Sequence, residues 1–225
     1  MLLTASLWLI GAAPASAGWQ LASADYFTGT KVDLTRWNVY NGPGNQGHGL
    51  RRPAQVTVSN GRLVITARMI NGVLNSGGLA HRTNRAYGRF EFLVRTDADP
   101  SAATSGAILT WPESGSLWRD GENDIYETGS AADRNPFYSF IHFGGNLQYN
   151  IVHYASATQW HKMVLEWEPS AMRIYRDGIL ARTITDVAAI PDSRHHLTIQ
   201  LDAVKNWMSS SVRMYVEYVR IYRRV

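Results

Sequence analysis

The chain has 225 residues, with 22 Lys and Arg against 18 Asp and Glu, and it contains no cysteine. The lack of cysteine excludes a disulfide scaffold, a thiolate-bound zinc or iron–sulfur site and a thiol nucleophile. A net charge of +4 without a basic cluster gives no indication of nucleic-acid binding. The 8 Trp, 11 Tyr and 6 Phe are unusual. Aromatic residues fill cores and also line sugar clefts, so both uses are open.

The N-terminal segment has the pattern of a targeting sequence. Residues 2–13 are almost wholly apolar, and Ala15-Ser16-Ala17 ends the stretch before Gly18. This predicts a signal peptide over residues 1–17 and a secreted, extracellular mature chain, with a buried N-terminal helix as the alternative. No Lys or Arg precedes the apolar run, so either Met1 is internal or the leader is weak. No later stretch is long and apolar enough to span a membrane.

The remaining chain alternates with the period of β-strands. Gly88–Arg95 places Phe90, Phe92 and Val94 on one face, and Val212–Tyr222 alternates in the same way. Asp177-Gly178 predicts a two-residue hairpin turn, and Asn75-Ser76-Gly77-Gly78 has the composition of a turn. Further strands are predicted at 63–68, 107–111, 123–127, 138–143, 162–167, 172–176, 179–182 and 196–201. Many short strands without a helical repeat predict one all-β domain over 18–225, a sandwich or jelly roll.

Three carboxylates stand within six residues, Glu122 to Glu127. In a regular strand Glu122 and Asp124 share a face, whereas Glu127 points the other way. If all three act together, one residue must bulge out between Asp124 and Glu127. Such a bulge puts the Glu127 side chain on the same face of the strand as Glu122 and Asp124. A solvated strand edge is the alternative, but like charges stacked on one face repel each other.

Such a set of carboxylates suits glycoside hydrolysis. A retaining glycosidase uses one ionised carboxylate as nucleophile and one protonated carboxylic acid. Glu at both ends of the motif provides the longer reach, and Asp124 between them can hydrogen-bond Glu122. Its negative charge also helps to keep a proton on a neighbouring carboxyl group.

Several segments in order along the chain resemble the laminarinase-type endo-β-1,3-glucanases of glycoside hydrolase family 16. They are 27–37, 61–68, 76–91, 118–127, 141–144, 160–167, 175–178 and 218–222. The resemblance implies a concanavalin-like β-jelly roll of two curved antiparallel sheets with a sugar cleft. It implies Glu122 as nucleophile, Glu127 as general acid/base and Asp124 as their assistant. The longer, bulged motif indicates β-1,3-glucan as the polysaccharide substrate, with agar-like galactans second.

Other activities stay open on the same scaffold. A lectin that binds glucan without cleaving it is one alternative, although the chain keeps all three carboxylates. Transglycosylation, with a sugar hydroxyl as acceptor, is another. The sequence departs from the family at Asn123 and Tyr126, where aliphatic residues are usual, and at Gln200–Val204, which lies near the cleft in relatives.

Candidate substrate-binding residues follow from the segments around the motif. Trp118 ranks first and Trp111 second for stacking on a sugar ring. His142 matches a cleft histidine of the family, and Asn45 and Arg82 are matched by segment resemblance alone.

Metals and cofactors have little support in the sequence. His195-His196 lacks a third ligand at suitable spacing, so no zinc site is predicted. No cofactor is required for carboxylate chemistry. Relatives often hold a structural calcium, whose ligands are not identifiable in this sequence. The sequence gives no indication of an oligomeric state.

Overall fold

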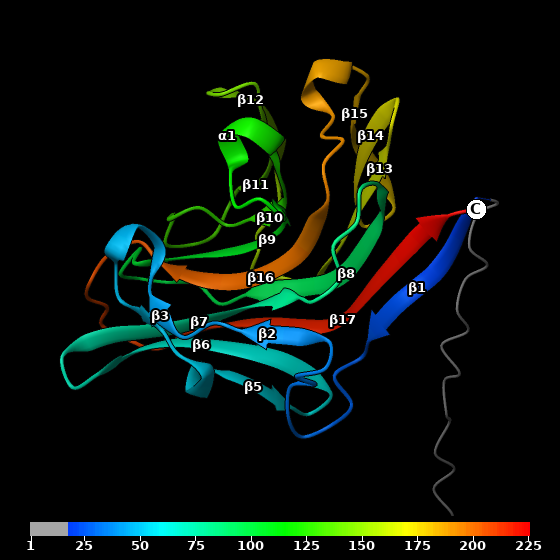
Figure 1. The fold of residues 1–225 in the computed structure, drawn as a ribbon. Helices are drawn as coiled ribbons and strands as arrows, with labels where there is room; N and C mark the ends of the chain where they lie inside the picture. The colour runs from blue at the N-terminus through cyan, green and yellow to red at the C-terminus, as the bar shows by residue number, and fades with distance from the viewer. Residues whose placement is uncertain (1–17) are drawn as a thin grey trace, which may run out of the picture.

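A computed structural model describes residues 18–225, and the predicted signal peptide, residues 1–17, lies outside them. The described chain forms a sandwich of two antiparallel sheets of the jelly-roll type, as predicted (Figure 1). Sheet A runs in the order β5 (Val56–Ser59), β6 (Arg62–Ile70), β17 (Val212–Arg224), β8 (Gly88–Thr96), β13 (His161–Glu168), β14 (Ala171–Arg176) and β15 (Ile179–Ile184). The strand β1 (Trp19–Asp25) pairs with the C-terminal half of β17.

Sheet B carries the other half of the sandwich. Its order is β2 (Trp37–Val39), β7 (Val73–His81), β16 (His195–Ala203), β9 (Thr104–Pro112), β10 (Glu122–Glu127), β11 (Phe137–Phe143) and β12 (Leu147–His153). Two short strands, β3 (Gly42–Pro43) and β4 (Leu50–Arg51), pair with each other, and β4 runs parallel to β7. The helical segments are α1 (Leu117–Asp120) and the 3-10 turns Asn45–Gly47, Pro53–Gln55 and Val187–Ala189.

The core lies between the two sheets because each strand buries alternate residues. Phe90, Phe92 and Val94 of β8 are fully or almost fully buried, and β16 contributes Leu197 and Ile199 from the opposite sheet. The intervening residues of β16 face away from sheet A. This period-two pattern is what the sequence predicted, and it sets which side chains of sheet B are free to build a site.

The predicted hairpin at Asp177-Gly178 is confirmed. Arg176 pairs with Ile179 across the turn, and both turn residues have positive φ, 53° and 84°. Two successive residues with positive φ form the type I′ turn whose twist matches the flanking strands.

The predicted turn at residues 75–78 is wrong, because these residues lie inside β7. The turn comes earlier, at Asn71-Gly72, where both residues have positive φ. The glycines serve close packing instead. A Cβ on Gly77 would lie 2.5 Å from a methyl carbon of Val56, and one on Gly78 would lie 2.9 Å from the Tyr40 ring. Small residues here let neighbouring groups approach the strand on both faces.

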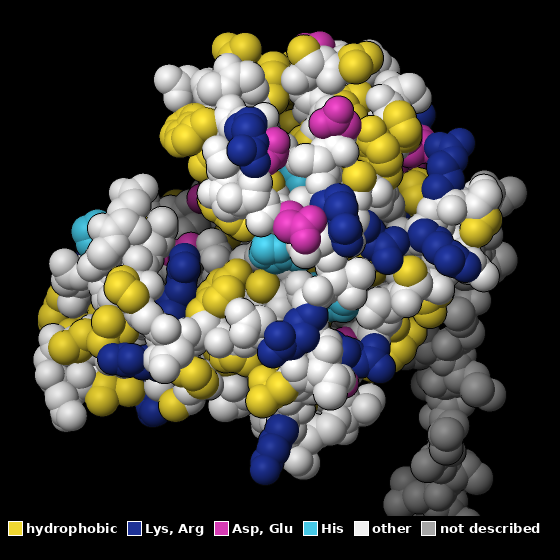
Figure 2. All heavy atoms as spheres, in the orientation of Figure 1, with side chains coloured by type: hydrophobic (Ala, Val, Ile, Leu, Met, Phe, Trp, Pro, Cys, Tyr) yellow, Lys and Arg dark blue, Asp and Glu magenta, His cyan; other side chains and the backbone are white. Residues whose placement is uncertain are grey.

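Within residues 18–225, none of the helices has the length and apolar character needed to cross a membrane. The surface seen in Figure 2 mixes Lys and Arg with acidic, hydrophobic and neutral side chains.

Candidate active site

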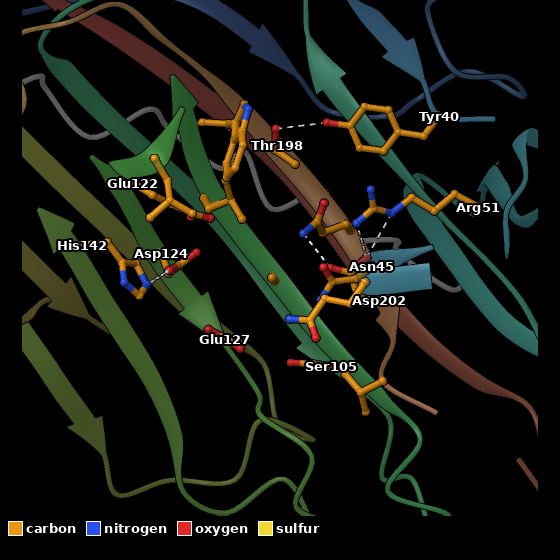
Figure 3. A pocket seen from close by; sticks show the side chains of 17 residues that line it. Tyr40, Asn45, Arg51, Ser105, Glu122, Asp124, Glu127, His142, Thr198 and Asp202 are labelled. Carbon is orange, nitrogen blue, oxygen red and sulfur yellow. Dashed lines mark hydrogen bonds and ion pairs between the residues drawn. The ribbon is translucent and has the colours of Figure 1, made fainter. Parts of the chain in front are cut away.

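A cavity of about 590 Å³ lies on the face of sheet B that points away from sheet A (Figure 3). Its floor comes from alternate residues of two neighbouring strands, Ser105, Ala107, Leu109 and Trp111 of β9 and Thr198, Gln200 and Asp202 of β16. The residues between them, such as Ile108 and Ile199, are buried in the core. The strand alternation therefore presents one set of side chains to the core and the other to the cavity.

A bulge in β10 brings all three carboxylates to this cavity. Asp124 pairs with Phe140 of β11, but the next paired residue is Glu127, opposite Tyr138. Two residues of β10 therefore stand opposite the single residue Ser139, whose hydroxyl donates to the Ile125 carbonyl oxygen at 2.7 Å. The extra residue exchanges the two faces of the strand after Ile125, so Glu127 points to the same side as Glu122 and Asp124. All three side chains line the cavity. The bulge predicted from the spacing of the motif is confirmed.

The three carboxyl groups lie in a poorly hydrated and mutually repulsive environment. Burial, followed by repulsion from Asp124, raises the pKa of Glu122 to about 9. Burial and the charge of Glu127 raise the pKa of Asp124 well above its usual value, and burial raises the pKa of Glu127. The site therefore holds protons at a pH where separated carboxyl groups would have lost them.

His142 places an imidazole in the cavity beside the three carboxyl groups. It stands on β11 directly opposite Glu122, and its Nε2 lies 3.0 Å from Oδ2 of Asp124. The imidazole partly offsets the rise in the pKa of Glu122 and of Glu127. The structure thus places His142 in the cavity and next to the carboxylates, where sequence reasoning had put it.

The opposite wall is built around a part-buried ion pair that sequence reasoning missed. Arg51 of β4 reaches Asp202 of β16, with its Nη2 at 2.6 Å and its Nε at 3.1 Å from the same carboxylate oxygen. Gln200 donates to the other oxygen of Asp202 at 2.6 Å. Burial raises the pKa of Asp202, and Arg51 counteracts part of that rise. The guanidinium also lies over the Tyr40 ring, 5.4 Å from its centroid.

The sequence contains a pattern that could have predicted the β16 residues of this wall. The predicted strand at 196–201 alternates, so Thr198 and Gln200 could have been assigned to one face together with Asp202. Arg51 lies in a two-residue strand without a periodic pattern, and nothing in the local sequence marks it. Ser105 was also missed; the residue lines the cavity, and its buried hydroxyl has no hydrogen-bond partner among the described residues.

Comparisons with known proteins place this geometry in a family. The family model described as glycosyl hydrolases family 16 matches residues 44–220. The chain belongs to this family. A curated beta-glucanase from Paenibacillus polymyxa is 24% identical over 155 residues, a match that spans 66% of this chain and 63% of the beta-glucanase.

Solved structures share the family 16 fold of this chain. The catalytic domain of an endo-1,3-beta-glucanase (laminarinase) from Thermotoga petrophila RKU-1 superposes with a TM-score of 0.77 at 20% identity, covering 92% of this chain and 98% of that one. The endo-beta-1,3-glucanase from Pyrococcus furiosus superposes with a TM-score of 0.78 at 19% identity, covering 92% and 95%. At these identities the likeness establishes the fold.

Of the remaining predicted substrate-binding residues of this family 16 chain, two line the cavity and two do not. Trp111 and Asn45 line the cavity. Trp118 does not line it; it is 60% exposed on the short helix α1, and its neighbour Leu117 contributes to the lining. Arg82 is also absent from the lining, because its Nε donates to the carbonyl oxygen of Leu34 at 2.8 Å. The sequence does not show which side chain of α1 faces the cavity, and it does not show that Arg82 bonds to Leu34.

The two family departures inside the motif are accommodated beneath the site. The Asn123 side chain is fully buried and donates to the Thr110 hydroxyl at 2.8 Å, and that hydroxyl lies 3.2 Å from Nδ1 of His195. The Tyr126 hydroxyl lies 2.9 Å from that of Thr96 in the core. Both polar side chains therefore face the interior of the sandwich and brace the strand that carries the carboxylates.

His195 belongs to this interior network. Its Nε2 lies 3.1 Å from the Asp120 carbonyl oxygen, and burial lowers its pKa. Over residues 18–225, the one group of three potential metal ligands found is Glu122, Asp124 and His142, whose ligand atoms lie within 4.8 Å of one another. Because Asp124 and His142 already bond to each other, the arrangement suits proton exchange within the cluster.

Proposed function

We propose that this protein is a secreted, retaining endo-β-glycosidase whose leading substrate is β-1,3-glucan. The observation that carries the proposal is the β10 bulge, which turns Glu122, Asp124 and Glu127 toward one cavity. A retaining mechanism needs two carboxyl groups on one site, one ionised and one protonated. Family membership and the beta-glucanase relative support the same chemistry.

In the proposed mechanism Glu122 is the nucleophile and Glu127 the general acid/base. Glu127 donates its proton to the leaving glycosidic oxygen while Glu122 attacks the anomeric carbon, which forms a covalent glycosyl-enzyme. Glu127 then removes a proton from water, and the hydroxide attacks the same carbon and releases Glu122. The overall result is hydrolysis with retained anomeric configuration.

Asp124 and His142 have supporting roles in this scheme. Asp124 lies between the two glutamates in sequence and contacts His142 at 3.0 Å. The raised pKa values of the three carboxyl groups keep a proton in the site for the leaving group. Before attack, Glu122 must be ionised, and Asp124 with its imidazole partner is placed to take up the proton that Glu122 releases.

The cavity also offers groups for positioning a sugar. Trp111 of β9 lines the cavity together with Glu122 and provides an aromatic surface. On the far wall Arg51 and Gln200, both held by Asp202, add donors. These donors and the aromatic surface of Trp111 suit a neutral, hydroxyl-rich polymer.

A polysaccharide panel tests the proposal. The protein is incubated with laminarin, lichenan, agarose, carrageenan and xyloglucan, and products are sized, with the anomeric proton of the first product followed by NMR. We expect internal cleavage of laminarin with initial release of the β-anomer. Binding of laminarin without cleavage of any polymer would identify a lectin. With a laminarin-derived oligosaccharide as the substrate, products longer than that oligosaccharide would identify a transglycosylase. Initial release of the α-anomer would refute the retaining mechanism.

A further inference from the structure

A second hollow, of about 300 Å³, lies on the outer face of sheet A. Its polar lining comes from β5, β6 and β17 and includes Thr57, Ser59, Arg62, Thr66, Arg213 and Tyr215. Residues that alternate with these, such as Leu63 and Met214, are buried between the sheets. The hollow therefore opens on the side of the sandwich opposite the active-site cavity, and in Figure 1 its strands β5, β6 and β17 lie in the layer below β16 and β9.

Two arginines in this hollow lack a neutralising partner. Neither Arg62 nor Arg213 forms an ion pair within 4.0 Å in the described part of the chain, whereas Arg95 close by is paired with Asp97 at 2.8 Å. Farther along the same face, Arg89 and Arg220 are both paired with one glutamate, Glu91. Arg62 and Arg213 thus differ from these three arginines, whose charges are neutralised by carboxylates on the same face.

The Arg62 side chain is held by an aromatic contact. Its guanidinium carbon lies 5.3 Å from the centroid of the Trp160 ring, and its Nε is buried with no hydrogen-bond partner among residues 18–225. Arg95 lies over the same indole at 5.6 Å. The aromatic contact fixes the position of Arg62, and its charge is not neutralised by any carboxylate within 4.0 Å among the described residues. Arg62 is therefore a fixed positive charge in the wall of the hollow.

We propose that this hollow binds an acidic polysaccharide through its carboxylate groups. Arg62 and Arg213 provide two guanidinium groups that can donate paired hydrogen bonds to such an anion. Ser59 pairs with Arg62 and Thr66 pairs with Arg213 across neighbouring strands, so a hydroxyl side chain stands beside each arginine and can bond a sugar hydroxyl. Two charges among several hydroxyls favour a saccharide over a nucleic acid or an anionic membrane, each of which calls for a broader basic surface. The site does not depend on catalysis in the other cavity.

Calorimetric titration with polygalacturonate tests this proposal on the whole protein. The test variant is Arg62→Gln/Arg213→Gln, and the matched control is Arg182→Gln/Arg223→Gln, which removes the same charge from two exposed positions elsewhere. We expect the Kd for polygalacturonate to rise at least tenfold in the test variant and to stay within twofold in the control. Inorganic sulfate and a DNA duplex are titrated in parallel and should bind more weakly than polygalacturonate.

Several results would overturn the proposal. Equal weakening in both double variants would indicate general attraction to a basic protein, and tighter binding of the duplex would indicate a nucleic-acid site. No binding of polygalacturonate to the wild type would also refute it. Thermal melting checks that the variants fold, and Arg213→Gln alone, at an exposed side chain, should still weaken binding if the double variant does not fold. Laminarin cleavage is measured separately, so failure here is distinguishable from failure of the proposed glycosidase.

Discussion

Two clusters of buried charge in this protein are built in opposite ways. Arg134 is fully buried, and its Nη1 donates to the carbonyl oxygens of Thr104 and Gly129 at 2.5 and 2.7 Å. Its Nη2 lies 3.7 Å from Oδ2 of Asp99. Asp99 in turn accepts from the backbone amides of Ala103 and Thr104 at 2.8 and 2.9 Å. Every charge in this cluster has partners, and the cluster joins the loop after β10 to the start of β9.

The carboxylate cluster on β10 has the reverse character. Glu122, Asp124 and Glu127 share one cavity with a single imidazole, and burial raises the pKa of each carboxyl group. Their mutual repulsion lowers the stability of the fold at neutral pH. The comparison teaches that satisfied buried charges mark a structural site, whereas crowded and unsatisfied ones mark a reactive site.

Breaking the Arg134 cluster gives the larger expected loss of stability. Arg134→Met leaves the buried Asp99 carboxyl group without its arginine and removes one hydrogen bond from each of the Thr104 and Gly129 carbonyl oxygens. We expect the free energy of unfolding to fall by about 3–5 kcal/mol, measured by urea unfolding. Arg182→Met, at an exposed position, is the control and should change stability by less than about 0.5 kcal/mol. Equal effects of the two substitutions would contradict the structural role of the cluster.

Relieving the carboxylate cluster gives a smaller effect of the opposite sign. The pKa of Asp124 is raised in the fold, so the folded protein retains a proton that the unfolded chain releases above about pH 4. That retention costs stability increasingly as the pH rises, and asparagine avoids the cost. Asp124→Asn should therefore raise the free energy of unfolding by about 1–2 kcal/mol at pH 8 and leave it unchanged at pH 3.

Thermal melting at both pH values checks this pH dependence. The control is Glu113→Gln, which removes a carboxylate at an exposed position outside the cavity. Its melting temperature should shift equally little at pH 3 and pH 8. A loss of stability in Asp124→Asn at pH 8 would show that the Asp124–His142 contact stabilises the fold more than carboxylate crowding destabilises it.

Much of the active site could be predicted because strand parity is a local property of the sequence. The offsets of Glu122, Asp124 and Glu127 conflict with a period of two, and a bulge is the local change that resolves this conflict. The alternation of β8, β16 and β17 likewise predicted which faces are buried. The Asp177-Gly178 turn was readable for the same reason, since a two-residue turn depends on its own residues.

The errors and omissions arose where distant segments meet. Gly77 and Gly78 look like a turn, but their small size serves the packing of Val56 and Tyr40 against β7. Arg51 and Asp202 are 151 positions apart, and only the fold brings them to one wall. Trp118 and Arg82 were predicted to bind substrate because of the segments that surround them in sequence. In the structure the Trp118 side chain is exposed, and Arg82 bonds to the carbonyl oxygen of Leu34.

The most direct test of the central claim measures activity and stability together on Glu122→Gln. Glutamine keeps the size of the side chain but cannot attack as a nucleophile, and it no longer adds a carboxyl group whose pKa is raised to about 9. We predict that release of reducing ends from laminarin falls by more than about 10⁴-fold, while the melting temperature at pH 7 equals or exceeds that of the wild type. Retained cleavage, or a variant that is inactive because its melting temperature has fallen, would contradict the account.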